Sequence, residues 1–148
     1  MSQYLSFELV NKANPEIKVD LGYWCTSIAR GITYNFNNIF EYTNDGDVEL
    51  DKETLVSYIN ELHAGIEEYK LNLKKTQEKK QANLDFLLRA QTETAVSTIM
   101  KNVDMFDASI DEWQEEIDTW QSVETKLKFI LYLLEDNNDG WKLVYGNS

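Results

Sequence analysis

The chain has 148 residues, of which 43% are hydrophobic and 12% are aromatic. This length and composition predict one folded domain, not a disordered segment or a pair of ordinary domains. Its 26 acidic and 14 basic residues give a net charge of −12, which would repel a nucleic-acid backbone and an anionic membrane surface. We therefore expect no direct binding of nucleic acid and no membrane partner. A partner protein with a basic surface stays open, and solubility alone is the alternative explanation of the charge.

The sequence shows no sign of export or of membrane insertion. The first ten residues, MSQYLSFELV, contain no basic stretch and no long apolar run, unlike a secretory signal peptide. No segment approaches the roughly 18 apolar residues that a membrane-spanning helix needs. Cys25 is the only cysteine, which excludes an internal disulfide bond. We expect a soluble, intracellular protein of the cytoplasm.

The first 50 residues are predicted to form a β-hairpin and a short helix. Two segments separated by the turn-like NKANP alternate apolar and polar residues, which is typical of half-buried strands. The apolar positions are Leu5, Phe7 and Leu9 in the first segment, and Ile17, Val19 and Leu21 in the second. From Tyr23 to Phe40, apolar residues recur every three or four positions, which indicates an amphipathic helix.

Residues 51–137 are predicted to form two long helices. This stretch contains one glycine, Gly65, and no proline, and these two residue types are the strongest helix breakers. Asp51 is a suitable N-cap. Apolar residues then recur in alternating steps of three and four, which is the a/d pattern of a coiled coil. A single helix of this length would measure about 130 Å, so an antiparallel hairpin is favoured.

The hairpin turn is predicted near residues 89–94, RAQTET, where Thr92 or Thr94 can cap the second helix. This turn pairs Tyr69 with Trp113, although a turn displaced by half a heptad would keep the same phase. The second arm's apolar series begins at Val96 and ends at Leu127, Leu131 and Leu134. The predicted structural seam consists of Leu62, Ile66, Tyr69, Leu73, Phe106, Ile110, Trp113, Ile117, Trp120 and Leu127.

Residues 110–121, IDEWQEEIDTWQ, nearly repeat themselves after seven positions. Two tryptophans among carboxylates suit a sugar-stacking platform, a partner-binding surface or a helix seam. The seam is favoured because Trp113 and Trp120 continue the three-and-four series on both sides. We predict that they face Tyr69 and Leu62, and that the carboxylates between them point outward.

A lysine-rich stretch, KLNLKKTQEKK at 70–80, would lie beside Asp104, Asp107 and Asp111 in the antiparallel register. Opposite charges beside a seam favour this orientation, although each exposed pair contributes only about 0.2–1 kcal/mol. Thr76 and Lys80 fall on the seam itself. The middle of the hairpin is therefore predicted to be its least stable section.

The C-terminal segment is predicted to add a third strand. The sequence DNNDG ends the second helix, and Trp141, Leu143 and Tyr145 then alternate. The expected fold is mainly α, in the α+β class: a long helical hairpin, a short helix and a small antiparallel sheet made by both terminal segments. We expect one domain over 1–148, comprising the parts 1–50, 51–137 and 138–148.

No residue set predicts catalysis or metal binding. His63 is the only histidine, and with Cys25 it supplies at most two metal ligands, where zinc needs three or four. A cysteine–histidine nucleophile pair is formally available, but Cys25 is expected on the apolar face of the predicted helix, where a free cysteine usually behaves as a small hydrophobic residue. The acidic residues Glu112, Glu115 and Asp118 are spaced as in the Glu-x-x-Glu pairs that hold magnesium between facing helices. The other arm, however, has no Glu-x-x-Glu motif to complete such a site. We expect a non-enzymatic protein with no catalytic residue, no metal site and no cofactor.

The remaining candidate is an acidic surface on the second arm. A solvated helix face is the alternative explanation. The residues proposed to bind a partner protein are Asp104, Asp107, Asp111, Glu112, Glu115, Glu116 and Asp118. The runner-up function is a structural or assembly protein that forms homo-oligomers through the hairpin or a sheet edge. This acidic, motif-free composition is also compatible with an accessory protein or inhibitor of a phage or mobile element.

Overall fold

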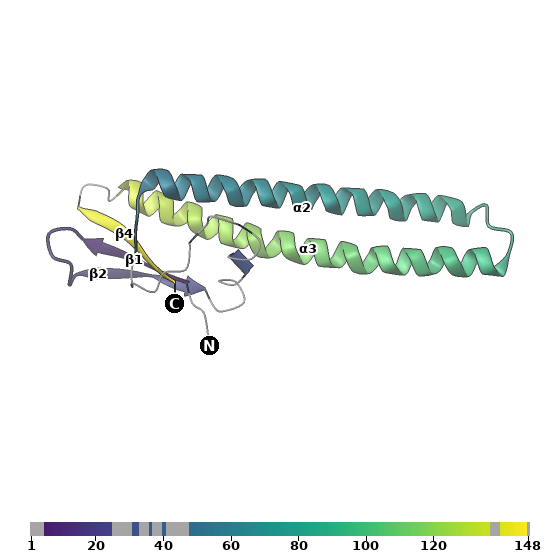
Figure 1. Ribbon diagram of the computed structural model, residues 1–148, viewed down its shortest axis with the longest axis horizontal. Helices are drawn as coiled ribbons and strands as arrows, with labels where there is room; N and C mark the ends of the chain where they lie inside the picture. Colours follow the sequence, from purple (N-terminus) through teal and green to yellow (C-terminus); the bar gives the residue numbers. More distant parts are fainter. Residues whose placement is uncertain are drawn as a thin grey trace. The chain divides into compact units, whose positions relative to one another are not determined.

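The computed structural model describes residues 5–24, 31–32, 36, 40, 48–136 and 140–147. Two long helices packed together and a small antiparallel sheet make up these residues (Figure 1), which confirms the predicted mainly α fold with β structure. The elements are β1 (Leu5–Asn11), β2 (Lys18–Trp24), β3 (Val48–Leu50), α2 (Lys52–Leu87), α3 (Glu93–Asp136) and β4 (Trp141–Asn147). The helix predicted between Tyr23 and Phe40 falls mostly outside the described residues.

The chain divides into two compact units. The sheet unit contains Met1–Leu62 and Glu124–Ser148, and the hairpin unit contains His63–Val123. Both long helices have one part in each unit.

The sheet of the sheet unit has the strand order β2-β1-β4-β3, and every neighbouring pair is antiparallel. In the register of β1 with β4, Phe7 lies opposite Tyr145 and Leu9 opposite Leu143. The N-terminal hairpin and the C-terminal strand are therefore both present as predicted. The three-residue strand β3 was not predicted, because it is too short to show an alternating pattern.

The two N-terminal strands differ in how well their apolar residues are covered. Leu5, Phe7 and Leu9 are buried, as predicted. Ile17 and Val19 are about half exposed, so the prediction that they form a buried face is wrong. Val19 lies opposite Leu9 across the ladder, but β2 is an edge strand of the described sheet, where fewer neighbours cover a side chain.

Aromatic rings form the core of the sheet unit. Phe40 is fully buried, and its ring meets those of Phe7, Tyr58 and Tyr145 edge to face, at centroid distances of 5.3, 4.9 and 5.2 Å. Such edge-to-face contacts add to the energy of apolar burial. Phe40 also adopts a positive φ of 49°, a conformation that a bulky residue keeps only when its surroundings hold it there.

Side-chain caps define where both long helices begin. The amide of Thr54 donates to Asp51 Oδ1 across 2.7 Å, and the amide of Ala95 donates to Thr92 Oγ1 across 3.0 Å. Asp51 is therefore the N-cap of α2, as predicted, and Thr92 is the N-cap of α3. The chain reverses between Leu87 and Glu93, which overlaps the predicted turn at residues 89–94.

Three contacts fix the register of the helices in the hairpin unit. The rings of Tyr69 and Trp113 lie 5.6 Å apart, centroid to centroid, which confirms their predicted pairing. Lys80 Nζ lies 2.6 Å from Asp107 Oδ1. Nearer the turn, the Asn102 amide donates to Asn83 Oδ1 across 3.3 Å. A polar asparagine pair inside a coiled-coil seam specifies register at some loss of stability.

The predicted seam residues divide into two groups by burial. Five are buried: Leu62, Ile66, Ile117, Trp120 and Leu127. Five are only partly covered: Tyr69, Leu73, Phe106, Ile110 and Trp113. Two packed helices cover only the centre of the seam between them, so partial exposure is expected for residues at its sides.

Two predictions about the ends of the second arm are wrong. Val96 is 39% exposed, because it lies in the first turn of α3, where periodicity cannot show how much of the partner helix remains to cover it. Ile130 is buried, whereas the predicted Leu131 is only partly covered. An unbroken three-and-four series from Trp120 passes through Val123, Leu127, Ile130 and Leu134, and these are the residues that are buried.

Candidate protein-interaction surface

Five acidic residues follow one face of α3 within the hairpin unit. Residues three or four positions apart lie on the same side of a helix, and the steps here are three, four, four and three. The five are Asp104, Asp107, Asp111, Glu115 and Asp118, which we call the acidic stripe. Glu112 and Glu116 lie beside it on the helix surface, and residues 104–118 contain no basic residue.

Most carboxylates of the acidic stripe are exposed and uncompensated. Asp107 pairs with Lys80, and Asp118 accepts a hydrogen bond from the Gln114 amide across 2.9 Å. In the part of the chain that the structure describes, Asp104, Asp111 and Glu115 form no ion pair and no side-chain hydrogen bond. Among the described residues, these three carboxylates and Glu112 are thus the predicted binding residues that take part in no ion pair or side-chain hydrogen bond.

Glu116 makes a contact that the sequence pattern did not predict. Its Oε2 accepts a hydrogen bond of 2.7 Å from the indole N–H of Trp120, so this carboxylate turns along the helix instead of pointing away from it. Trp120 is buried, and a buried indole needs an acceptor for its single donor. Glu116 thus accepts the hydrogen bond that the buried indole of Trp120 needs. The spacing of residues along the helix could not predict this bond, because spacing gives the direction of a side chain and not its rotamer.

The aromatic pair in the seam lies in a negative environment. Burial raises the pKa of the Tyr69 hydroxyl above its usual value, and the negative charges of Glu116 and Glu68 raise this pKa further. Nearby negative charge disfavours formation of a phenolate. Two carboxylates outside the acidic stripe, Glu116 and Glu68, therefore act on the ionisation of this seam residue.

The lysine-rich stretch of α2 pairs only in part with α3. Lys80 bonds to Asp107, as its predicted position beside the acids implies. Lys70 instead bonds to Glu67 of its own helix across 3.3 Å. Within the described residues, no ion pair joins a lysine to Asp104 or Asp111. The first arm therefore leaves most of the charge on the second arm uncompensated.

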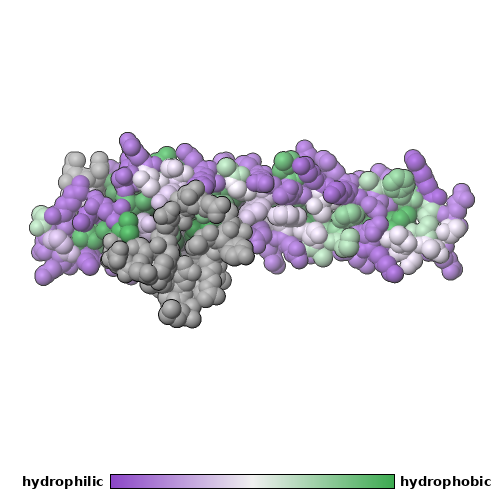
Figure 2. All heavy atoms as spheres, viewed as in Figure 1, coloured by the Kyte–Doolittle hydropathy of each residue, from purple (hydrophilic) through white to green (hydrophobic). Residues whose placement is uncertain are grey.

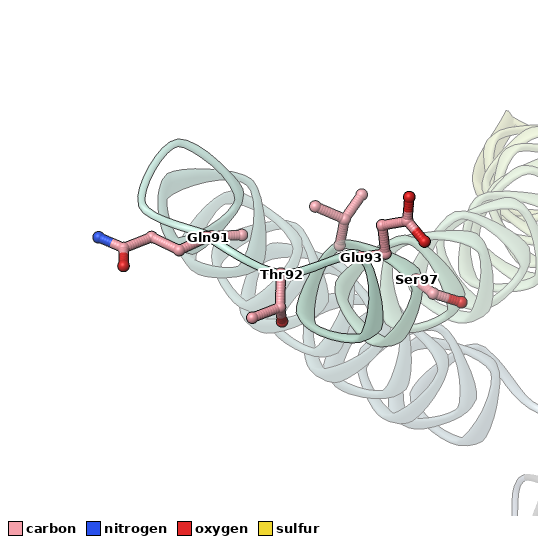
Figure 3. A pocket seen from close by; sticks show the side chains of 6 residues that line it. Gln91, Thr92, Glu93 and Ser97 are labelled. Carbon is pink, nitrogen blue, oxygen red and sulfur yellow. The ribbon is translucent and has the colours of Figure 1, made fainter.

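The N-terminal end of the acidic stripe continues into apolar residues at the hairpin tip. Val96 and Met100 precede Asp104 at steps of four, and they are 39% and 41% exposed. A depression of about 420 Å³ adjoins Val96 (Figure 3). It is lined by Ala90, Gln91, Thr92, Glu93, Val96 and Ser97. The sequence-based binding candidates do not include this end, because the three-and-four series places Val96 in the seam, whereas its spacing from Asp104 places it on the same helix face as the acidic stripe.

Figure 2 shows the remainder of the visible hairpin surface as mainly hydrophilic, with separate hydrophobic patches. Two of the largest exposed side chains near the turn are Phe86 and Leu88, at 61% and 87% exposure. Phe86 also lines a smaller depression of about 230 Å³ with Ala82, Asp85 and Arg89. Exposed apolar residues that gather in one place on a surface are typical of contact surfaces.

The residues considered for chemistry do not form a site within the described chain. His63 Nε2 lies 3.8 Å from Glu67 Oε1, and both side chains are more than half exposed. Cys25 lies outside the described residues. Among the residues that are described, no group of three or more His, Cys, Asp or Glu side chains is arranged to hold a metal ion. None of the helices found there is both long and apolar enough to cross a membrane.

No protein-family model, curated protein or solved structure matches this chain. The surface itself is therefore the basis for a functional assignment.

Proposed function

We propose that this chain is a non-enzymatic protein that binds a partner protein through the acidic stripe of α3. The observation that supports this most directly is the set of exposed carboxylates at Asp104, Asp111 and Glu115, which have no partner among the described residues. They stand on a helix whose opposite side is packed against α2 through contacts such as Tyr69–Trp113. Because the helix is packed, its carboxylates keep a fixed spacing. A partner surface with positive charges at the same spacing can therefore be complementary to it.

The partner that fits is a protein with a basic surface. Opposite charges accelerate association and exclude partners of the wrong charge, and both effects weaken as salt screens them. A basic surface that otherwise holds nucleic acid has the matching sign, so docking of this chain would block that surface or recruit its owner. The net charge of −12 also favours association with a basic partner.

The test is affinity capture from a lysate of the source cells with the full chain and two charge-reversed variants. The first variant carries Asp111→Lys, Glu115→Lys and Asp118→Lys. The control carries Glu16→Lys, Glu78→Lys and Asp136→Lys, which changes the net charge equally at exposed positions outside the acidic stripe. We expect the wild type and the control to capture the same protein at low salt and the first variant to lose it. Capture by all three proteins alike would contradict the proposal.

Homo-oligomerisation is a second candidate function, supported by the exposure of Phe86 and Leu88 beside the turn. Light scattering of the full chain at increasing concentration tests it directly. A rise in mass that disappears with Phe86→Ser and Leu88→Ser would support assembly through the tip. A strict monomer at high concentration would exclude self-assembly as the function.

A further inference from the structure

We infer that the docking surface of α3 joins an apolar end to an acidic body, and that its occupant is a partner helix with a bulky apolar residue at one end followed by basic residues at helical spacing. This inference rests on the proposed function and specifies the partner's chemistry. It assigns a binding role to Val96, which the three-and-four pattern places in the seam, and to Met100, for which the pattern makes no prediction.

The first argument is continuity on one helix face. Val96, Met100 and Asp104 follow one another at steps of four, and the acidic stripe then runs on to Asp118. A helix turns once in 3.6 residues, so these positions form one line that spans about 33 Å. A partner helix of about 22 residues has the same length, and side chains on one of its faces recur with the same spacing.

The second argument is the shape of the tip. The depression beside Val96 has a volume of about 420 Å³, which lies within the range of about 300–1,000 Å³ typical of ligand-binding cavities. Ala90 and Ser97 contribute small side chains to its lining, and Figure 3 shows Thr92, Glu93 and Ser97 along the first turns of α3. A leucine or phenylalanine side chain that enters it would remove the exposed part of Val96 from water as well as its own surface.

The third argument is charge. Asp104, four residues after Met100, is the first acidic residue of this line. None of the described residues forms an ion pair with Asp104, Asp111 or Glu115. Basic side chains on the occupant would meet these carboxylates while its apolar end fills the tip. A second copy of this chain fits less well, because each copy carries a net charge of −12 and two such copies repel one another.

The experiment uses two synthetic, fluorescently labelled peptides of about 20 residues with capped ends. Both are alanine-based helices with lysines at alternating steps of three and four. One peptide has leucine at the end of the lysine face, and the other has serine at that position. Fluorescence anisotropy measures their binding to the full-length chain at low salt. We expect the leucine peptide to bind about 10- to 100-fold more tightly, since burial of one such side chain contributes on this scale.

Two variants locate the effect. Val96→Ser with Met100→Ser should abolish the advantage of the leucine peptide, so that the two peptides bind this variant with similar affinity. Phe129→Ser with Tyr132→Ser, which removes two other exposed apolar side chains of α3, should preserve the advantage. Circular dichroism of each variant verifies that the helices are retained, and the comparison of the two peptides on the wild type does not depend on any variant.

The possible failures are distinct. If both peptides bind equally well, and both lose binding to the variant with Asp111→Lys and Glu115→Lys, the binding role of Val96 and Met100 is wrong. The proposed function of the acidic stripe would remain intact. Binding of neither peptide would overturn the inference, and affinity capture would then test the proposed function separately. A dimer of the wild type that becomes a monomer with Val96→Ser and Met100→Ser would show that a second copy covers the tip, which also overturns it.

Discussion

The indole N–H of Trp120 donates a hydrogen bond of 2.7 Å to Glu116 Oε2, one helical turn earlier on α3. This bond joins the buried seam to the acidic face of the same helix. Trp120 is only 3% exposed, so its ring is part of the core and is not available to stack on a ligand.

Truncation of this ring should therefore destabilise the protein strongly. We expect Trp120→Ala to lower the free energy of unfolding by about 3–5 kcal/mol, because it removes a large buried side chain and leaves a cavity. Trp120→Phe should lower it less, since most of the apolar volume remains and Glu116 can turn to solvent. Urea titration measures both values. Near-neutral stability of Trp120→Ala would contradict a core role and favour a binding platform.

Tyr69 should make stability sensitive to alkaline pH. Burial raises the pKa of its hydroxyl above 10.0, and the charges of Glu116 and Glu68 add to the rise. Because the folded-state pKa exceeds the unfolded one, this stabilising contribution is complete below pH 10 and is lost as pH rises through the folded-state value. The free energy of unfolding of the wild type should thus fall more steeply above pH 10 than that of Tyr69→Phe.

The variant Glu116→Gln provides the matched comparison for Tyr69. It removes one of the negative charges that raise this pKa and keeps an oxygen that can accept the Trp120 hydrogen bond. Its alkaline slope should lie between those of the wild type and Tyr69→Phe. Tyrosinate absorbance recorded along the same pH series reports the ionisation directly. Equal slopes for all three proteins would show that Tyr69 titrates normally.

The contrast between Tyr69 and Val19 shows what the sequence could predict. In the long helices, three-and-four spacing placed Tyr69 opposite Trp113, and cap chemistry identified Asp51, because both signals are local. Alternation also located the strands near Leu9, but it cannot show whether a strand lies at a sheet edge. Val19 is exposed for that reason.

The candidate surface was predictable to a similar extent. The spacing of the acids along the chain is sufficient to place Asp104 and Asp111 on one helix face. Two features of this surface could not be predicted from the spacing of residues. The rotamer that turns Glu116 to Trp120 depends on a three-dimensional contact, and the exposure of Val96 depends on where α2 ends. The contacts of Phe40 in the core of the sheet unit could not be predicted from local spacing either, since its aromatic partners come from strands and a helix that are distant in sequence.

Lys80 should limit the stability of the middle of the hairpin. It falls on the predicted seam and pairs with Asp107 at 2.6 Å, but both groups are partly exposed and such a pair contributes only about 0.2–1 kcal/mol. We expect Lys80→Leu to raise the free energy of unfolding by up to about 1 kcal/mol through added apolar burial. Hydrogen exchange should show slower amide exchange in residues 73–84. Lys79→Leu is the control at an exposed position, and a loss of stability with Lys80→Leu would contradict the prediction.

Thr92 should stabilise the start of α3 through its side chain. The Ala95 amide donates to Thr92 Oγ1 across 3.0 Å, and loss of such a cap lowers stability by about 0.5–2 kcal/mol. We expect this loss with Thr92→Ala, little change with Thr92→Ser, and little change with Thr94→Ala. Urea titration of the three variants distinguishes the two threonines. A larger effect at Thr94 would show that Thr92 is not the cap that stabilises α3.

Gly22 should not tolerate a side chain. Its φ of +96° is one that residues with a Cβ rarely adopt, and an added Cβ would lie 3.0 Å from Lys126 Nζ. That ammonium group stands 5.0 Å from the centre of the Trp24 ring. We expect Gly22→Ala to lower the free energy of unfolding by about 1–3 kcal/mol, mainly through the backbone conformation, because the end of a lysine side chain can move aside.

Two comparisons separate the causes at Gly22. Gly140→Ala should change stability by no more than about 0.5 kcal/mol, since a Cβ there would meet no atom within 4 Å and the residue does not have a positive φ. Adding Lys126→Ala to Gly22→Ala removes the contact but not the backbone strain, so most of the loss should persist relative to Lys126→Ala alone. Thermal unfolding of the wild type and these four variants measures the differences. Recovery of full stability in the double variant would instead assign the loss to the contact with Lys126.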